Sequence, residues 1–406
     1  MLDAATRAQI KATAPVLQTH GEALTRHFYA RMFTHNPELR EVFNQGHQRS
    51  GTQQQALAMA VGAYATHIDA PEALTPALRH IASKHVSLGV REEHYAIVGR
   101  HLLASIGEVM GEAATPALLQ AWAAAYDQLA RLLIGMEQAL YNDAASRPGG
   151  WTGWRTFRVR HKQPEGSEIT SFKLVPADGG PVPAYRAGQF VSVRAVVPEL
   201  GYRQPRQYSL SAAPGQDHLR ISVKREQAGP TCPAGMVSQH LHDRLHAGDC
   251  LEVSPPAGDF YLDESSSSPV VLISAGVGIT PMMAMLAQLQ ATAPHRVVRF
   301  LHAARHAGVQ AFADEVRRRT GALRDAKAWF VHEQAAPQAG LPVPDAYGRL
   351  NLEALPGADW LPHDADCHVC GPAAFMVEQM GALRARGIPA ERIHAEAFGT
   401  GGVATA

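Results

Sequence analysis

The stretch RPGGWTGW, Arg147 to Trp154, divides the sequence into two parts with different residue patterns. Upstream of it, alanine, leucine and glutamine dominate, and apolar residues recur every three or four positions, as in amphipathic helices. Prolines stand where helices are expected to begin, because a helix tolerates proline in its first turn: Pro37, Pro71, Pro76 and Pro116. Residues 1–147 are therefore predicted to form an all-α domain.

Downstream of this turn, apolar and polar residues alternate in short runs such as FRVRHKQ, ITSFKLVP and GQFVSVRAV, separated by Gly, Pro and Asp. Several strands at such short spacing indicate a closed antiparallel β-barrel over residues 151–263. The run ESSSSP at 264–269 is a second linker. After it, buried-strand candidates such as VVLISAG and HRVVRFLHAA alternate with helical segments, which predicts an α/β domain with a parallel sheet over residues 268–406.

Length and charge agree with a multi-domain soluble protein. The chain has 406 residues, too many for one typical core, and its 37 basic residues balance 37 acidic ones. No global field attracts nucleic acid or an anionic membrane, so neither is an expected partner. The N-terminus lacks the apolar core of a signal peptide, and the most apolar stretch is interrupted by Gly276, Gly278 and Pro281, so no membrane insertion and a cytoplasmic location are expected.

The sequence CHVC places Cys367 and Cys370 at the spacing of a redox dithiol or of half a zinc site. No second ligand pair follows, and the motif lies late in its domain, directly before Gly371 and Pro372. We favour two structural thiols at the end of a buried strand over redox work.

The motif RQYS, Arg206 to Ser209, lies in the barrel region. It is either a surface strand with an incidental arginine or a binding motif for a flavin nucleotide. In the second interpretation Arg206 neutralises a pyrophosphate, Tyr208 lies against a flat ring system and Ser209 bonds to its edge. Downstream, GMVSQHLH resembles a loop that enters a helix, where backbone N–H groups and Ser238 would hold the same pyrophosphate.

The motif AGVGITPM, Ala275 to Met282, follows a predicted strand and precedes a predicted helix. In that context Gly276 and Gly278 permit a tight turn and a close approach to a dinucleotide phosphate. Cys370, Gly371 and Pro372 end another strand, where α/β sheets bind ligands. Near the C-terminus, Phe398 offers an aromatic ring to cover a flavin.

Histidines in the helical part are candidate metal ligands. His85 shares an apolar face with Ile81 and Leu88, whereas His80 and His94 fall on other faces. A histidine on an apolar face is in general more often a core residue than a ligand. Glu137, however, lies on or beside the buried face of a strongly apolar helix, where a carboxylate needs a partner such as the second ring N–H of a ligating histidine. Tyr95, on an inward stripe of its own helix, would join the same hydrogen-bond set.

Upstream residues have the chemistry of a small ligand pocket. Tyr29 lies on a helix rich in aromatic residues, Phe43 follows in a loop, and Gln53 and Leu57 lie one turn apart on one face. Two hydrogen-bond donors and apolar walls are what a pocket for bound dioxygen opposite a haem requires. Each residue alone is more often core filling, and for Tyr29 alone the two interpretations are about even.

The motifs R-x-Y-S, G-x-x-S, G-x-G-x-T-P, C-G-P and F-G, in this order, resemble those of the ferredoxin–NADP reductase superfamily. This resemblance implies FAD in the barrel, NADH or NADPH in the α/β domain, and hydride transfer to the flavin, which then releases single electrons. The helical part resembles a globin, and a globin joined to such a reductase is similar over essentially the whole chain to the flavohaemoglobin family.

The resemblance also implies site residues. His85 would be the proximal ligand of a b-type haem, with Tyr95 and Glu137 as its hydrogen-bond partners. The distal side would consist of Tyr29, Gln53 and Leu57, with Phe43 packed on the haem. The implied FAD contacts are Phe190, Arg206, Gln207, Tyr208, Ser209, Gly235, Ser238, Ala397, Phe398 and Gly399. The implied contacts to the nicotinamide nucleotide are Ala275, Gly276, Val277, Gly278, Ile279, Thr280, Pro281, Cys370, Gly371 and Pro372.

This sequence departs from the family pattern in places. Many relatives have Gly where this chain has Ala275, family barrels usually have Tyr in place of Phe190, and the tail TGGVATA is unlike the usual ending. Arg305 and His306 follow a predicted strand where a 2′-phosphate would bind, but two basic loop residues do not decide between NADH and NADPH.

The activity that the resemblance implies is nitric oxide dioxygenation by a monomer, in which two NO and two O₂ become two nitrates for each NAD(P)H consumed. Three alternatives stay open. One is a haem reductase for peroxides, quinones or lipid hydroperoxides, and another is an oxygen or NO sensor or carrier. The third is a haem-free oxidoreductase whose helical domain only mediates contacts.

Overall fold

The computed structural model describes residues 2–43, 51–229, 234–335 and 340–398. The chain separates into two compact units. Unit 1 contains residues 1–147, 151–154 and 194–206, and unit 2 contains residues 148–150, 155–193 and 207–406. Within the described residues, no helix is both long and apolar enough to span a bilayer.

Residues 1–147 of unit 1 are helical, as the apolar periodicity predicts. Its α-helices are α1 (Ala4–His35), α3 (Thr52–Thr66), α4 (Thr75–Leu88), α5 (Glu92–Met110) and α6 (Pro116–Ser146). Short 3₁₀ turns lie at Pro37–Glu41, Pro71–Leu74 and Gly111–Ala113. The prolines predicted to begin helices all lie in the first turn of a helix or of a 3₁₀ turn, which confirms that interpretation. Asp3 caps α1 by accepting the backbone N–H of Thr6 at 2.7 Å.

The core of unit 1 lies among α1, α3, α5 and α6. Phe28 and Met32 of α1 and Ile106 of α5 are among its fully buried side chains. Helix α4 packs on α6, and it ends at Gly89, whose φ of 75° places the residue in the left-handed region. Only residues 89–91 connect α4 to α5, and both helices pack against α6.

The first part of unit 2 belongs to an antiparallel sheet. Its strands are β1 (Arg155–Pro164), β2 (Ile169–Pro176), β3 (Phe190–Val197), β4 (Tyr202–Ser209), β5 (Leu219–Lys224) and β6 (Cys250–Val253), and helix α7 (Met236–Asp243) follows β5. The segment 194–206 of unit 1 supplies parts of two of these strands, β3 and β4. Among the described residues the strand order is β4-β3-β6-β1-β2-β5. The two edge strands meet through one antiparallel bridge between Leu210, just after β4, and Ile221 of β5. The predicted antiparallel architecture is therefore confirmed, while the barrel is joined at this edge by that bridge and not by a continuous ladder.

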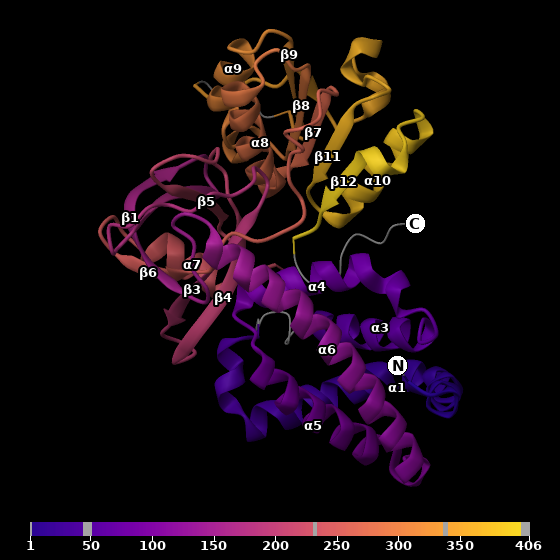
Figure 1. The fold of residues 1–406 in the computed structure, drawn as a ribbon. Coiled ribbons are helices and arrows are strands. Elements are labelled where there is room, and N and C mark those ends of the chain that lie inside the picture. Colours follow the sequence, from indigo (N-terminus) through magenta and orange to yellow (C-terminus); the bar gives the residue numbers. More distant parts are fainter. Residues whose placement is uncertain (1, 44–50, 230–233, 336–339, 399–406) are drawn as a thin grey trace. The chain divides into compact units, whose positions relative to one another are not determined.

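The second part of unit 2 is a parallel sheet covered on both faces, as predicted. Its strands are β7 (Val270–Ala275), β8 (Val298–Ala304), β9 (Ala326–His332), β10 (Ala346–Tyr347), β11 (Asp366–Cys370) and β12 (Ile393–Glu396), in the order β10-β9-β8-β7-β11-β12 over the described residues. Helices α8 (Ile279–Thr292) and α9 (Ala313–Gly321) cover one face, and α10 (Ala373–Ala385) covers the other (Figure 1).

The strand order places a topological switch point in this sheet. From β7 the chain continues to β8 on one side, whereas β11 pairs with β7 on the other side. The loops after β7 and after β11 therefore leave the sheet in opposite directions, and ligands of α/β sheets bind in the crevice between such loops. These two loops are the ones that carry AGVGITPM and CGP.

Candidate functional site

Three helices of unit 1 bring His85, Tyr95 and Glu137 together. His85 Nδ1 lies 2.8 Å from Glu137 Oε1 and 3.1 Å from the Tyr95 hydroxyl oxygen. The Tyr95 hydroxyl donates to the same carboxylate oxygen at 2.5 Å. The Glu137 side chain is 3% exposed and the His85 side chain 33%. The buried Glu137 carboxylate thus has two hydrogen-bond donors. One of them, His85, is partly exposed at the edge of the packed interior.

Local structure explains why His85 and not its neighbours takes this position. His85 lies in the last turn of α4, and Tyr95 is in the first turn of α5. Glu137 lies on the buried stripe of α6 with Leu133 and Ala130. His94, in contrast, accepts the backbone N–H of Arg91 through its Nδ1 at 3.1 Å and so caps the start of α5. This position agrees with helical phase, which puts His94 on a face other than the inward one.

The hydrogen bonds determine which nitrogen of His85 is available. Because Nδ1 faces a carboxylate, we assign the ring proton to Nδ1, which leaves the lone pair on Nε2. Burial and the hydrogen bond to Glu137 raise the pKa of Tyr95 far above its ordinary value, so this side chain stays a neutral donor. The group therefore fits a haem iron: one histidine nitrogen is free to ligate, and a carboxylate on the other nitrogen makes the ring more electron-rich.

The predicted distal residues lie on α1, on α3 and in the loop after α1. The Tyr29 side chain is 5% exposed, and its ring contacts Phe33 and Phe43 at centroid distances of 5.9 and 5.8 Å. Leu57 packs against the same cluster. Gln53 Oε1 is buried and has no hydrogen-bond partner among the described residues. A buried amide oxygen without a partner fits a side chain that borders a ligand site.

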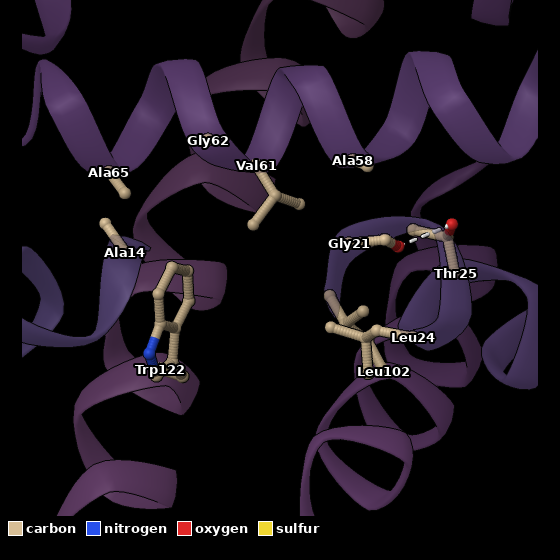
Figure 2. Close-up of a pocket in the computed structure, with 10 residues that line it drawn as sticks. All are labelled: Ala14, Gly21, Leu24, Thr25, Ala58, Val61, Gly62, Ala65, Leu102 and Trp122. Atoms are coloured by element: carbon tan, nitrogen blue, oxygen red, sulfur yellow. Dashed lines mark hydrogen bonds between the residues drawn. The ribbon is translucent and has the colours of Figure 1, made fainter. Parts of the chain in front are cut away.

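A separate apolar hollow lies between α1, α3, α5 and α6 (Figure 2). None of the predicted site residues lines it. It is lined by Ala14, Gly21, Leu24, Thr25, Ala58, Val61, Gly62, Ala65, Leu102 and Trp122. Figure 2 shows two polar side-chain atoms there. The Thr25 hydroxyl donates to the Gly21 carbonyl at 2.8 Å, and the Trp122 ring nitrogen donates to the Thr13 hydroxyl at 3.0 Å, so both already have protein partners.

In unit 2 the two loops at the switch point touch through their glycines. A Cβ on Gly278 would lie 2.2 Å from the Cys370 carbonyl oxygen, and a Cβ on Gly371 would lie 3.2 Å from the Cβ of Ala275. No side chain fits at Gly278. The AGVGITPM loop, which contains Val277, ends in helix α8, where Ile279, Thr280 and Pro281 are buried. Bare backbone before a helix N-terminus forms a cradle that fits the phosphates of a nucleotide.

Cysteines 367 and 370 belong to strand β11, which confirms that they end a buried strand. Burial raises the pKa of the Cys367 thiol to about 12 and that of Cys370 well above its ordinary value. Both thiols are therefore protonated and poor nucleophiles at neutral pH. Arg305, the residue considered for a 2′-phosphate, forms an ion pair with Glu168.

The predicted FAD residues lie mainly on β4 and at the start of α7. Gln207 and Tyr208 are half-buried in β4 and Ser209 is buried. Arg206 Nη1 donates to the Pro205 carbonyl at 2.7 Å. The Ser238 hydroxyl donates to the Gly235 carbonyl at 2.9 Å and accepts the Glu226 N–H at 3.1 Å, so this hydroxyl holds the loop.

The remaining FAD candidates are aromatic or lie near the C-terminus. The ring of Phe190 is about 3 Å from where a Cβ on Gly258 would lie, so it packs on that backbone. Phe398 is 46% exposed, and Ala397 packs against the apolar core next to α10. An exposed aromatic ring fits a role as a cover for a flat ring system. Gly399 lies outside the described residues.

Sequence reasoning missed a buried ion pair, Arg220–Glu315. Arg220 stands at an outward position of the alternating strand LRISVK, and Glu315 lies in the charged helix segment ADEVRRRTG. Each looks like an ordinary solvent-facing residue in that pattern. Only their long-range contact makes them unusual, and one sequence contains no signal for it.

Known proteins match the chain in three consecutive segments. A globin family model matches residues 26–133, an oxidoreductase FAD-binding domain model matches 158–261, and an oxidoreductase NAD-binding domain model matches 272–380. A flavohemoprotein of Bordetella parapertussis is 59% identical over 406 residues, which is all of both chains. One from Chromobacterium violaceum is 57% identical, over 98% of this chain and 99% of its own.

Two solved structures are also similar. The flavohemoglobin from Malassezia yamatoensis, which has bound FAD and heme, matches with a TM-score of 0.85 at 30% identity and covers 98% of this chain and 100% of its own. The FAD/NAD-binding domain of a nitric oxide dioxygenase from Vibrio cholerae matches with a TM-score of 0.55 at 39% identity, over 60% of this chain and 98% of its own.

Proposed function

This chain belongs to the flavohemoprotein family, an oxidoreductase family that uses haem, FAD and a nicotinamide nucleotide, and from that premise we propose that it is a nitric oxide dioxygenase. The reaction is NAD(P)H + 2 NO + 2 O₂ → NAD(P)⁺ + 2 NO₃⁻ + H⁺. The structural relative from Vibrio cholerae is the FAD/NAD-binding domain of a nitric oxide dioxygenase. The observation that carries the proposal is the contact of His85 with the buried carboxylate of Glu137.

The chemistry is divided among three proposed domains, residues 1–147, 151–263 and 268–406. When bound, haem supplies the iron at which O₂ and NO react, and FAD converts a hydride into single electrons. His85 would hold the iron through Nε2. Glu137 would accept from Nδ1 and make the ring a stronger electron donor, as in haem enzymes that activate oxygen. Tyr95 fixes the carboxylate through its short hydrogen bond.

On the distal side, Tyr29 and Gln53 would donate hydrogen bonds to bound oxygen, while Leu57 and Phe43 exclude water. Gln53 Oε1 is buried without a partner among the described residues, so the amide lacks a protein group that would hold it, and its Nε2 would be the donor to oxygen. Aromatic contacts with Phe33 and Phe43 hold the Tyr29 ring in place.

In unit 2 the residues that we assign to the nucleotide are Ala275 to Pro281 and Cys370 to Pro372. Glycine backbone and the N-terminus of α8 would receive the phosphates. The flavin would lie along β4, against Tyr208, Ser209 and Arg206, with Phe398 as its cover. The exposed ring of Phe398 supports that assignment.

The proposal is tested by comparing electron acceptors. NADH oxidation by the purified holoprotein is followed with O₂ plus NO, with hydrogen peroxide, with a quinone and with a lipid hydroperoxide, and each rate is compared with that of His85→Ala. We expect NO with O₂ to give the fastest turnover and the variant to lose it. If a peroxide or quinone is turned over faster than NO, the protein is a reductase for that acceptor. If NADH does not reduce the haem at all, it is a sensor or carrier.

A further inference from the structure

A buried ion pair joins the antiparallel sheet to the nucleotide-binding part of unit 2. Arg220 Nη1 of β5 lies 2.9 Å from Glu315 Oε2 of α9, and Nη2 lies 3.4 Å from Glu315 Oε1. The Arg220 side chain is 10% exposed and the Glu315 side chain 14%. Two parallel contacts between a guanidinium and a carboxylate fix distance and orientation together.

Arg220 is also tied to the end of the predicted flavin strand. Its guanidinium donates to the Ser211 carbonyl, and its Nε donates to the Ser211 hydroxyl at 3.1 Å. Ser211 is two residues beyond Ser209 of the RQYS motif. The Ser211 hydroxyl in turn contacts that of Ser222 at 2.7 Å, and Ser222 contacts Ser171 at 2.8 Å. A chain of buried polar contacts thus connects the segment just after β4 with β5 and β2.

Glu315 is tied to the helices of the nucleotide-binding part. Arg319 Nε donates to Glu315 Oε1 at 2.9 Å, and Arg319 Nη1 donates to Gln290 of α8 at 2.7 Å. Helix α8 begins at the loop that approaches Cys370. The ion pair therefore connects the flavin strand to the helix that would hold the nucleotide phosphates.

Phe312, directly before α9, is a second unusual residue at the same place. We call the contact of Arg220 with Glu315, together with Phe312, the joint. Its φ is 59°, the only positive φ of a non-glycine residue in the described chain. A bulky side chain rarely adopts this conformation unless surrounding contacts impose it, and such residues gather at functional sites. The Arg220 guanidinium lies over the Phe312 ring, 5.2 Å from its centroid. Helix α9 thus begins in a strained residue that packs on the arginine of the joint.

The charges of the joint are stable at neutral pH. Burial alone would raise the pKa of Glu315, but the charges and hydrogen bonds of Arg220 and Arg319 outweigh burial and hold the pKa below its ordinary value. The carboxylate is therefore ionised when the enzyme works. Because the pair is largely shielded from water, its geometry is more sharply determined than that of an exposed pair.

We propose that Arg220 and Glu315 are positioning residues for hydride transfer, since they fix the flavin strand relative to the nucleotide-binding loops. In that step the C–H bond at the nicotinamide of NAD(P)H breaks and its hydrogen leaves with both electrons. A new bond to the flavin ring forms, and a proton from water completes FADH₂ while NAD(P)⁺ remains. The proposal rests on the NAD(P)H-to-FAD half of the proposed function and is independent of NO.

The test is anaerobic stopped-flow reduction of the FAD in the holoprotein by saturating NADH, without NO. For Glu315→Gln we expect the reduction rate constant to fall about 10- to 100-fold, the range that a misplacement of about 1 Å causes. The apparent KM for NADH, the flavin spectrum and NAD⁺ binding by calorimetry should change little. With NADH deuterated at the transferred position, the variant should show a full isotope effect, because hydride transfer then limits the rate.

A matched control breaks another buried pair in the same unit. Asp366 pairs with Arg296, with side chains 15% and 2% exposed, and both residues belong to the nucleotide-binding part. Asp366→Asn should leave the rate of flavin reduction within about twofold of the wild type. An equal slowing by Asp366→Asn would overturn the proposal, because loss of any buried pair would then suffice.

A readout without any cofactor separates positioning from catalysis. In the flavin-free protein, the backbone amides of α9 should exchange with deuterium faster in Glu315→Gln than in wild type. If Glu315→Gln does not fold, Arg220→Lys decides: it keeps the charge but lacks the planar fork that reaches Ser211 and Glu315 together. A wild-type reduction rate in the folded variant overturns the proposal, and a slowed rate with an unchanged KM supports it.

Discussion

The candidate site of the helical unit consists of side chains, whereas that of the parallel sheet consists of backbone. In the first, α4, α5 and α6 each supply one residue, and hydrogen bonds of 2.5 to 3.1 Å connect His85, Tyr95 and Glu137. In the second, the loops after β7 and β11 approach so closely that Gly278 has no room for a Cβ beside the Cys370 carbonyl. Removing functional atoms should disable the side-chain site, and adding atoms should disable the backbone site.

Gly278→Ala should have the greatest effect of the substitutions considered. Its new methyl carbon would lie 2.2 Å from the Cys370 carbonyl oxygen, so the α8 loop must move away from the loop after β11. We expect NADH-driven flavin reduction to fall by about 100-fold or more. Ala275→Gly is the control, because it removes a methyl group from the same loop without a clash, and its rate should stay near that of the wild type. A normal rate in Gly278→Ala would show that the loops need not touch.

Glu137→Gln tests the side-chain site with no change of shape. The amide removes the negative charge next to His85 while it keeps the volume of the side chain. We expect NO consumption to fall about 10- to 100-fold, the usual effect of removing the partner of a ligating histidine, with haem content close to that of wild type. Unchanged NO consumption in this variant would contradict the role of the carboxylate.

Two buried histidines of the parallel sheet should make the fold sensitive to acid. In the parallel sheet, burial first and the neighbouring histidines second lower the pKa of His302 and of His368 to about 3. In the unfolded chain each of these histidines takes up a proton near pH 6.5, whereas in the folded protein it does so only near pH 3. The stability that each neutral histidine contributes is therefore fully present above pH 6.5 and is lost as the pH falls toward 3. At pH 5 each histidine should cost roughly 2 kcal/mol of unfolding free energy. Thermal unfolding of wild type and His302→Asn at pH 7 and pH 5 measures this, and the variant should lose less stability. Equal losses in the two proteins would contradict the assignment.

Tyr95→Phe should have the smallest effect, because it removes one hydrogen bond from Glu137 and leaves the bond from His85. A net loss of about 1 kcal/mol corresponds to roughly a fivefold slower NO consumption. The rate is measured with an NO electrode at saturating NADH. If Tyr95→Phe is slowed as much as Glu137→Gln, the tyrosine and not the carboxylate dominates the group.

The same contrast explains what the sequence could predict. Helical phase selects His85, Tyr95 and Glu137 as residues on or beside inward faces, because the period of a helix determines which side chains share a face. Phase alone leaves His85 a core residue, and its role as a ligand rests on Glu137, the distal residues and the reductase motifs taken together. The glycine loops follow from motif context, since a strand before and a helix after confine the turn. The alternation of apolar and polar residues in short runs predicted the antiparallel sheet, and the alternation of strands with helices predicted the parallel sheet.

Long-range contacts were beyond the reach of local patterns. Arg220 and Glu315 are 95 residues apart, and each resembles a solvent-facing residue of its own element. The left-handed Phe312 has no local signal either, since sequence preference would place glycine or asparagine there. The Ser238 hydroxyl, expected at a pyrophosphate, holds the Gly235 loop because its nearest partners are backbone atoms.

Isotope labelling of the product tests the central claim most directly. The holoprotein is given NADH, ¹⁵NO and ¹⁸O₂, and the nitrate is examined by mass spectrometry while NADH oxidation is followed. A nitric oxide dioxygenase yields [¹⁵N]nitrate with two ¹⁸O atoms, and two nitrates for each NADH. Nitrate with a single ¹⁸O atom, or NADH oxidation that produces no nitrate, would contradict the account.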